Sequence, residues 1–400
     1  MNPIVVPMLS IITPTFNRSF QLKNVYNSLL KNNNNCFEWI IVDDGSDDST
    51  GKEVTKWMSE KKINIRYVFQ DNAGVTCARE RGEHMVNTEW MTWIDSDDIF
   101  KEHAVDRIFE CITKFSEELN ANKCAGLLFP LEINGKYEIT TGRHTLTEQY
   151  YKYGLSGEFM AVMKTNIHNR FGFPKFRGER FVTESVLFRK IDYYYYYLCL
   201  NIPIVIRRYL NDGLTSNINS IHDNNEYGTA YSIKTDCAYG RHMGVLKRAQ
   251  AYTDYNNYLH NCLQVEEDIF PELRVPLGIK IFSQVFYNNF LLSFLRSVLV
   301  YPFPYKKIPP KSEIVLYGAG NIGQAYMRQI SVTNYCNIKL WVDMMHSVKH
   351  KMGLNVKAPE ALSNLKEFDY IVLAIKSQKE RKKVYEQLIE LGIATYKIID

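Results

Sequence analysis

The chain has 400 residues, of which 46% are hydrophobic, and a formal net charge of +4 at pH 7. This length fits two or three domains, and the hydrophobic fraction is ample for real cores. The basic residues are scattered rather than clustered with stacking aromatics, so we expect no nucleic-acid partner. The eight cysteines show neither Cys-x-x-Cys nor zinc-like spacing, and the first residues lack a secretory signal. We therefore expect reduced thiols and a cytoplasmic protein.

Three apolar segments in the first hundred residues each run into a polar loop. Residues 8–12 lead into 13–18, residues 38–42 into 43–46, and residues 91–94 into 95–98. Helical patterns at 18–31 and 49–61 separate the first segments, and this alternation predicts an α/β fold with a parallel sheet. Ligands of such folds bind at the carboxyl edge of the sheet, where the loops gather.

Asp95, Asp97 and Asp98 place three carboxylates within four positions. Carboxylates this close repel one another unless a cation neutralises them. Mg²⁺ or Mn²⁺ held by one or two carboxylates commonly completes its shell with substrate phosphates, so the expected ligand is a diphosphate. The alternative is an acidic turn in which Asp98 caps a helix that begins near Ile99.

Four segments together resemble the family 2 glycosyltransferases with the GT-A fold, in order and in spacing. They are Thr13-Pro14-Thr15-Phe16-Asn17, Asp43-Asp44-Gly45-Ser46, Asn72-Ala73-Gly74 with Ala78-Arg79 and Gly82, and Asp95-Ser96-Asp97-Asp98. The resemblance covers about residues 8–215 and weakens after residue 130. It implies a mixed, mainly parallel sheet and transfer of a sugar from a nucleotide-sugar donor with inversion at the anomeric carbon. We expect a UDP-sugar as the donor.

The resemblance places Pro14, Phe16, Asp43, Asp44 and Gly74 in the donor pocket. An Asp at a strand end can accept hydrogen bonds from uracil or ribose, and Pro14 and Phe16 would form an apolar wall near the base. The alternative for the two aspartates is a structural Asx-turn, since Asp-Gly is a strong turn signal.

Arg79 is expected to approach the diphosphate from the helix that Gly74 opens, although a solvated helix face is the alternative. Asp97 is the first choice as ligand of a catalytic Mn²⁺ or Mg²⁺ ion. Asp95 is expected to contact ribose, or the metal through water, and Asp98 to bind sugar hydroxyls. The metal would act as a Lewis acid on the leaving diphosphate.

Inversion by single displacement also needs a base that removes the acceptor hydroxyl proton. Family members often carry Glu-Asp or a lone Glu at a helix start in the segment 176–188, which makes Glu184 the candidate base and Glu179 the reserve. Ser185 stands where an Asp often follows, and Glu184 could simply start an amphipathic helix. Farther on, residues 207–215 suggest a strand and an active-site loop whose arginines bind phosphate, or else a solvated edge strand.

The strand-and-loop pattern ends near residue 224, so residues 1–224 are the predicted glycosyltransferase domain and 225–310 a helical connector. Helical patterns cover 249–263 and 279–300. The stretch 286–300 is interrupted by polar residues and is a poor transmembrane candidate. Burial against the catalytic domain is one interpretation. An interfacial helix is the other, because aromatic and basic residues follow at 301–307.

Residues 311–400 carry a second signature. A strand at 313–317 leads into Gly318, Gly320 and Gly323 of a G-x-G-x-x-G motif, and a strand at 338–342 ends in Asp343. This pattern predicts a Rossmann-like parallel α/β domain with a possible second nucleotide site for NAD or another nucleotide. Alternatively, the glycines serve only the turn and the helix packing, and the domain serves docking.

The sequence thus predicts a metal-dependent inverting glycosyltransferase of the hexosyl type. Its acceptor would be a saccharide or polyol-phosphate hydroxyl of a cell-surface polysaccharide, a teichoic-type polymer or a glycolipid. One alternative is a bifunctional enzyme whose C-terminal domain binds NAD or a nucleotide sugar, and another is a non-catalytic scaffold. Peripheral contact with the inner face of the membrane and a homo-oligomer are left open.

Overall fold

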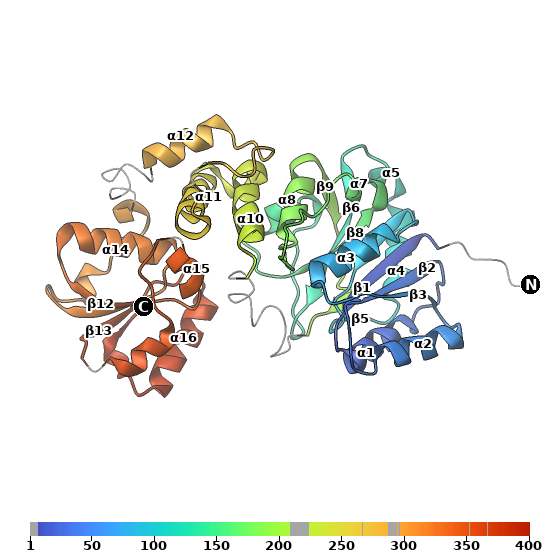
Figure 1. Cartoon of the computed structure of the whole chain (residues 1–400), viewed down its shortest axis with the longest axis horizontal. Coiled ribbons are helices and arrows are strands. Elements are labelled where there is room, and N and C mark those ends of the chain that lie inside the picture. Colours follow the sequence, from blue (N-terminus) through green and yellow to red (C-terminus); the bar gives the residue numbers. More distant parts are fainter. Residues whose placement is uncertain are drawn as a thin grey trace, which may run out of the picture. The chain divides into compact units, whose positions relative to one another are not determined.

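The computed structural model describes residues 7–208, 224–265, 267–286, 294, 297–351, 353–365 and 367–400. Contacts within the chain divide it into two compact units, Met1–Gly244 and Val245–Asp400 (Figure 1). Helix α10 (Glu226–Tyr239) falls in the first unit. The sequence predicts three segments, 1–224, 225–310 and 311–400, whereas the contacts define two units. The separate helical connector stays a prediction.

The first unit is built on one mixed sheet of ten strands. Their order is β3-β2-β1-β4-β8-β6-β10-β5, with β9 beside β6 and β7 beside β9. The bounds are β1 Leu9–Thr15, β2 Phe37–Asp43, β3 Asn64–Phe69, β4 Trp90–Trp93, β5 Ile99–Phe100, β6 Cys124–Glu132, β7 Gly142–His144, β8 Phe159–Lys164, β9 Tyr196–Cys199 and β10 Val205–Ile206. Strands β1 to β4 are parallel, whereas β8 is antiparallel to β4 and β6. The predicted mixed, mainly parallel sheet is confirmed, and the loops after β1, β2 and β4 meet at its carboxyl edge.

The helices of this unit cover both faces of the sheet (Figure 1). They are α1 Ser19–Leu29, α2 Thr50–Glu60, α3 Val75–His84, α4 Ala104–Lys114, α5 Ser116–Leu119, α6 Leu146–Tyr151, α7 Thr165–His168, α8 Ser185–Tyr194 and α10. Successive side chains of a strand point to opposite faces. Ile11 and Trp39 therefore join the core under α1 and α2, while Ile12 faces α3. Gly82 lets α3 approach closely, because a Cβ there would lie 2.5 Å from Ile12 Cγ2.

The segment after the acidic cluster does not begin a helix. Ile99 and Phe100 form β5, which pairs antiparallel with β10, and α4 starts only at Ala104. The interpretation of Asp98 as the cap of a helix near Ile99 is therefore wrong. The carboxylate of Asp98 has other partners, described below.

Asp192 on α8 gives the first unit a pH-dependent stability. Its Oδ2 accepts hydrogen bonds from the backbone N–H (2.7 Å) and the hydroxyl of Thr147. Burial raises the pKa of Asp192 to about 6, although Thr147 and Arg189 act in the opposite direction. In the unfolded chain the pKa of an Asp is about 3.9. Between about pH 4 and pH 6 the folded state therefore binds more protons than the unfolded state. The stability that the protonated Asp192 contributes is lost as the pH rises through about 6.

We expect Asp192→Asn to flatten the pH profile of stability by on the order of 2 kcal/mol between about pH 4 and pH 7. The measurement is the free energy of unfolding in urea at a series of pH values. The difference between wild type and variant isolates this carboxyl group from the other titrating residues. Parallel profiles for the two proteins would contradict the assignment.

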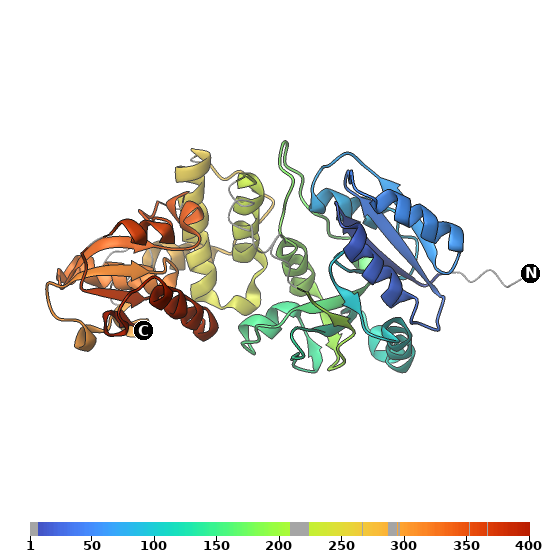
Figure 2. The same cartoon turned by 90° about the horizontal axis from the view of Figure 1, so that it is seen from below.

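The second unit carries a separate sheet of four parallel strands in the order β12-β11-β13-β14. Its elements are α11 Val245–Tyr258, η3 Leu259–Leu263, α12 Leu277–Phe286, η4 Tyr305–Lys307, β11 Glu313–Tyr317, α14 Asn321–Thr333, β12 Asn337–Val342, α15 His346–Lys351, η5 Pro359–Asn364, β13 Tyr370–Leu373, α16 Gln378–Glu390, η6 Thr395–Lys397 and β14 Ile398–Ile399. Figure 2 shows helices on both faces of this sheet. Alternate residues of β11 enter two cores, Leu316 beside Ile330 of α14 and Val315 beside Leu388 of α16. The predicted parallel α/β architecture is confirmed.

Two predicted segments of the chain lie partly or wholly outside the described residues. The predicted helix at 279–300 overlaps α12 (Leu277–Phe286) and the helical residues 297–300, while 287–293 and 295–296 lie outside the described residues. The predicted active-site loop at 209–215 also lies outside them. In the part of the chain that the structure describes, no helix has the length and hydrophobicity needed to cross a membrane.

Candidate active site

Arg79 joins three elements at the carboxyl edge of the sheet. It projects from α3 and is only 5% exposed. Its Nη1 donates to Glu184, at the start of α8, and its Nη2 donates to Asp95 Oδ1 at 2.7 Å. Burial opposes the charge of the guanidinium, but the two carboxylates outweigh this effect and raise the pKa of Arg79. Arg79 is thus a fixed positive charge rather than part of a solvated helix face.

Arg207 follows β10 and approaches the acidic cluster from the other side. Its Nη1 donates to Asp95 Oδ2 at 3.0 Å and to Asp98 Oδ2 at 3.1 Å, and its Nε pairs with Glu158 at 3.1 Å. Burial favours protonation of Asp95, but Arg79 and Arg207 outweigh it and lower the pKa of Asp95. Burial raises the pKa of Asp98 to about 7 despite Arg207. Asp98 also accepts a hydrogen bond from the backbone N–H of Arg208 at 3.2 Å.

Asp97 differs from its two neighbours. It is half-buried, and among the described residues it forms no ion pair. Burial and the negative charge of Asp95 raise the pKa of Asp97. A carboxylate whose ionised form is disfavoured in this way gains most from an added cation. The chemistry of Asp97 therefore fits the predicted role of metal ligand.

The acidic cluster contains side chains of the type that bind a divalent metal ion. The carboxylates gathered around the two guanidinium groups are those of Asp95, Asp97, Asp98, Glu158 and Glu184. Within the described ranges, no three His, Cys, Asp or Glu side chains are arranged to hold an ion by themselves. Mg²⁺ and similar ions often use one or two protein carboxylates and complete the shell with substrate phosphates. The cluster fits that second mode, in which the nucleotide supplies the remaining ligands.

A pocket lies directly beside this cluster. Its polar wall consists of Arg79, Asp95, Asp98 and Glu184, and its apolar wall of Trp93, Ile94, Leu131, Phe159, Met160, Ala161, Phe188 and Val205. The sequence patterns do not reveal this apolar wall or Glu158. Glu158 precedes β8, and Phe159, Met160 and Ala161 belong to it, but an apolar strand pattern does not reveal that β8 inserts antiparallel beside β4. The only local signal was a Glu immediately before an apolar strand.

Asp43 and Asp44 lie at the end of β2, where the carboxylates hold loops together. Asp43 accepts from the backbone N–H of Ser46 and from the hydroxyl of Tyr67, both at 2.8 Å. Asp44 accepts from the backbone N–H groups of Ala73 and Gly74, both at 2.8 Å, and from the Gln70 amide at 2.7 Å. The contact between Asp43 and Ser46 is a local turn, as the structural alternative predicts, whereas the contacts of Asp44 join it to a segment 26 to 30 positions away. The donor-binding role of both residues stays a prediction.

The loop after β1 lies beside the loop after β2. The Asn17 backbone N–H donates to Ser46 Oγ at 2.9 Å. Pro14 is buried within β1, whereas Phe16, just beyond the strand, has 46% of its surface exposed. An exposed ring at this edge is available for a ligand, and the predicted role of Phe16 beside the base remains a prediction.

Gly74 allows the segment before α8 to cross the start of α3. Its φ is +92° and its ψ is 159°, a region that is essentially restricted to glycine. A Cβ at this position would lie 2.2 Å from the carbonyl oxygen of Arg180. Thr76 Oγ1 fixes the same crossing, because it accepts from the backbone N–H of Val182 at 3.0 Å.

We expect Gly74→Ala to lower the free energy of unfolding by about 3 kcal/mol or more, because conformational strain and overpacking add. Gly178→Ala is the matched control. Gly178 also has a positive φ, +85°, but nothing lies within 4 Å of its added Cβ. We expect the control to lose about 1 kcal/mol in urea denaturation. Equal losses in the two variants would show that the contact with Arg180 is unimportant.

The two candidate bases occupy different environments. Glu184 directly precedes α8, lines the pocket, and has 45% of its side chain exposed. The carboxylate of Glu179 instead accepts from the backbone N–H groups of Tyr227 (2.6 Å) and Gly228 (2.7 Å) at the start of α10. Burial raises the pKa of Glu179, although these hydrogen bonds lower it. The structure therefore brings Glu184, and not Glu179, to Asp95 and Arg79.

The glycine motif of the second unit is closed by its own acidic residue. Gly318 has φ +109°, and a Cβ on Gly323 would lie 1.9 Å from the Gly318 carbonyl oxygen. The carboxylate of Asp343 accepts from the backbone N–H groups of Ala319 and Met345. Only Gly320 faces open space. Turn and packing requirements thus account for two of the three glycines, and nucleotide binding at Gly318, Gly320, Gly323 and Asp343 stays a prediction.

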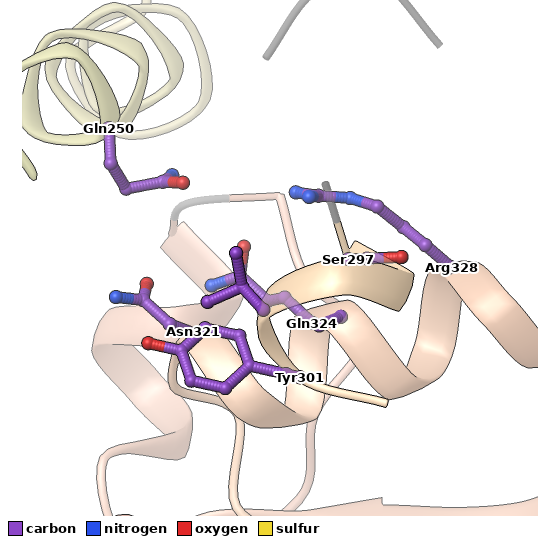
Figure 3. Close-up of a pocket in the computed structure, with 8 residues that line it drawn as sticks. Gln250, Ser297, Tyr301, Asn321, Gln324 and Arg328 are labelled. Atoms are coloured by element: carbon purple, nitrogen blue, oxygen red, sulfur yellow. The ribbon is translucent and has the colours of Figure 1, made fainter. Parts of the chain in front are cut away.

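Another pocket of the second unit lies against α14 (Figure 3). It is lined by Gln250, Ser297, Val300, Tyr301, Asn321, Gln324, Ala325 and Arg328. The residues from α14 recur at helical spacing on one side, whereas none of the motif glycines is among the lining residues. Asn321, which lies between Gly320 and Gly323 of the motif, is nevertheless one of the lining residues, so the pocket adjoins the predicted nucleotide site.

Two family models match the chain. Residues 10–124 match the model described as Glycosyl transferase family 2, and residues 310–399 match the model described as C2185-like, N-terminal. Glycosyltransferase GlyA of Streptococcus pneumoniae is 28% identical over 116 residues, which are 29% of this chain and 16% of that protein. The putative teichuronic acid biosynthesis glycosyltransferase TuaG of Bacillus subtilis is 28% identical over 105 residues, which are 26% of this chain and 41% of that protein. The matches thus span less than half the length of these relatives.

A similar solved structure is that of Staphylococcus aureus TarS 1-349 in complex with UDP-GlcNAc. The TM-score is 0.50 at 17% sequence identity, and the match covers 82% of this chain and 92% of that chain. At this identity the likeness concerns the fold. It agrees with the GT-A fold that the sequence predicts.

Proposed function

We propose that the chain is a metal-dependent inverting glycosyltransferase with a UDP-sugar donor, on the premise that residues 10–124 match the model described as Glycosyl transferase family 2. The observation that carries the proposal is the cluster at the end of β4. There, Arg79 joins Asp95 to Glu184, and Asp97 stands without an ion pair among the described residues. These groups supply what a single displacement requires: a base, a metal ligand and fixed positive charge.

In this proposal Glu184 removes the proton from the acceptor hydroxyl as the hydroxyl attacks the anomeric carbon. Its carboxylate is accessible from the pocket, and the Arg79 guanidinium holds it in position. Arg207 holds Asp95 and Asp98, so the turn that carries Asp97 stays fixed while the donor binds. Asp97 would hold Mn²⁺ or Mg²⁺, which when bound supplies Lewis-acid stabilisation of the leaving diphosphate.

Donor and acceptor are proposed from what the similar proteins are named for. UDP-GlcNAc in the TarS complex supports a UDP-sugar donor. The name of TuaG, a putative teichuronic acid biosynthesis glycosyltransferase, supports a saccharide or polyol-phosphate acceptor that belongs to a cell-surface polymer. We place the reaction in the cytoplasm at the inner face of the membrane, where an acceptor attached to lipid would be presented.

A second nucleotide-binding role for the C-terminal unit has one supporting observation. Gly320 faces open space at the start of α14, where backbone N–H groups attract anions. The carboxylate of Asp343 is already bound by backbone N–H groups, which disfavours its use for a ribose hydroxyl. A non-catalytic scaffold is less well supported than either role, because it has no need for the carboxylates around Arg79 and Arg207.

The proposed function can be tested by thermal unfolding of the full chain with UDP, UDP-sugars, GDP and NAD, each with and without Mn²⁺. Ligand binding stabilises the folded state by mass action, so the cognate UDP-sugar with metal is expected to raise Tm by several degrees. A shift with NAD alone would favour the bifunctional alternative. The absence of a shift with every nucleotide would overturn the proposed function.

A further inference from the structure

The outer side of α12 exposes an apolar surface. Ile279 and Ser283 are buried against the second unit, and Ser283 shares a hydrogen bond of 2.7 Å with Thr253 of α11. The exposed fractions on the other side are 72% for Leu277, 50% for Ile281, 38% for Phe282 and 41% for Val285. We call these four residues the apolar face of α12. Singly exposed apolar residues are common in proteins, but four within three turns of one helix indicate an interaction surface.

The apolar face is continuous around the helix. With about 100° between successive residues, its four side chains span an arc of about 140°. The buried Ile279 and Ser283 lie on the opposite side. Lys280 and Gln284, both exposed, border one edge of the arc. The exposed side of α12 is therefore itself amphipathic, with an apolar arc and a polar border that carries the positive charge of Lys280.

The surrounding sequence carries only one sign of charge. Residues 273–312 contain no Asp or Glu, although the whole chain has 44 among its 400 residues. The same stretch contains the basic residues Arg274, Lys280, Arg296, Lys306, Lys307 and Lys311. An apolar arc within a stretch that is free of acidic residues complements a surface that is apolar inside and negatively charged outside.

We propose that the apolar face of α12 binds the surface of an anionic lipid bilayer. The four apolar side chains enter the boundary between headgroups and acyl chains, and Lys280 at the border of the arc attracts the lipid phosphates. A second copy of the chain is a poorer occupant, because a symmetric contact would bring the same positive charges together. This inference does not depend on the proposed transferase activity.

Co-sedimentation of the full chain with lipid vesicles tests the proposal. Vesicles of phosphatidylcholine mixed with phosphatidylglycerol are expected to bind the protein, and vesicles of phosphatidylcholine alone much less. Ile281→Ser combined with Val285→Ser should weaken binding at least about tenfold, because two exposed apolar groups lose their burial in lipid. Lys280→Glu should weaken binding to the anionic vesicles, and this effect should shrink as salt is added.

Leu391→Ser is the matched control, because Leu391 is 64% exposed in the same unit but lies outside α12. It should bind vesicles as the wild type does. All substituted positions are exposed, and unchanged Tm values would verify folding. Equal binding of the α12 variants and the wild type, or no binding to anionic vesicles, would overturn the proposal. Concentration-dependent self-association that the α12 substitutions abolish, without vesicle binding, would instead identify a second copy as the occupant.

Discussion

Asp97→Ala is expected to reduce kcat/KM for sugar transfer by about a thousandfold, equivalent to about 4 kcal/mol of transition-state stabilisation. Asp97 is the carboxylate of the cluster for which the described residues provide no ion pair, and burial raises its pKa. Its removal should therefore weaken the binding of the cation more than it disturbs the protein. The measurement is the rate of UDP release with acceptor across a series of Mn²⁺ concentrations.

The variant should also lose the metal-dependent part of its stabilisation by UDP. Glu117→Gln is the control, because it removes a carboxylate from the exposed surface of α5. The control should retain both activity and stabilisation. If Asp97→Ala keeps its response to metal, the ligand is a different group, and Asp95 or Asp98 becomes the next candidate.

Glu184→Gln should lower kcat by a factor of about 10² to 10⁴ with little change in the KM for the donor. Glutamine retains an oxygen that accepts from Arg79, so the geometry of the pocket is preserved while the base is removed. Steady-state kinetics with varied donor and acceptor would separate an effect on the chemical step from one on binding.

Glu179→Gln provides the comparison. The Glu179 carboxylate caps the start of α10 through two backbone N–H groups. Its replacement should leave kcat within a few-fold of the wild type and reduce stability by about 1 kcal/mol. A large loss of kcat in Glu179→Gln with a small one in Glu184→Gln would exchange the two roles.

Much of the fold could be predicted from the sequence because its elements carry strong local patterns. The strands predicted at 38–42 and 313–317 correspond to Phe37–Asp43 and Glu313–Tyr317. Strand polarity then follows from the βαβ order, so the grouping of the 13–17, 43–46 and 95–98 loops is also predictable. The strands and the order of the loops can be predicted because they follow from patterns of residues that are close in the sequence.

The features that were missed depend on contacts between distant segments. The partners of Arg79 lie 16 and 105 positions away, and Arg207 contacts Asp98 and Asp95, which are 109 and 112 positions away, as well as Glu158. No local pattern indicates that one guanidinium will hold a carboxylate so far along the chain. For the same reason, the sequence could not distinguish Glu184 from Glu179, which are only five positions apart but face different helices.

The contacts of Arg79 also determine where this chain can be recombined with a relative. A chimera whose junction lies between α3 and α8 would take Arg79 from one parent and Glu184 from the other. A buried guanidinium that loses one of its carboxylates typically costs several kcal/mol. A functional chimera between relatives therefore requires that residues 75–98 and 179–185 come from the same parent, although the two segments are separated in the gene.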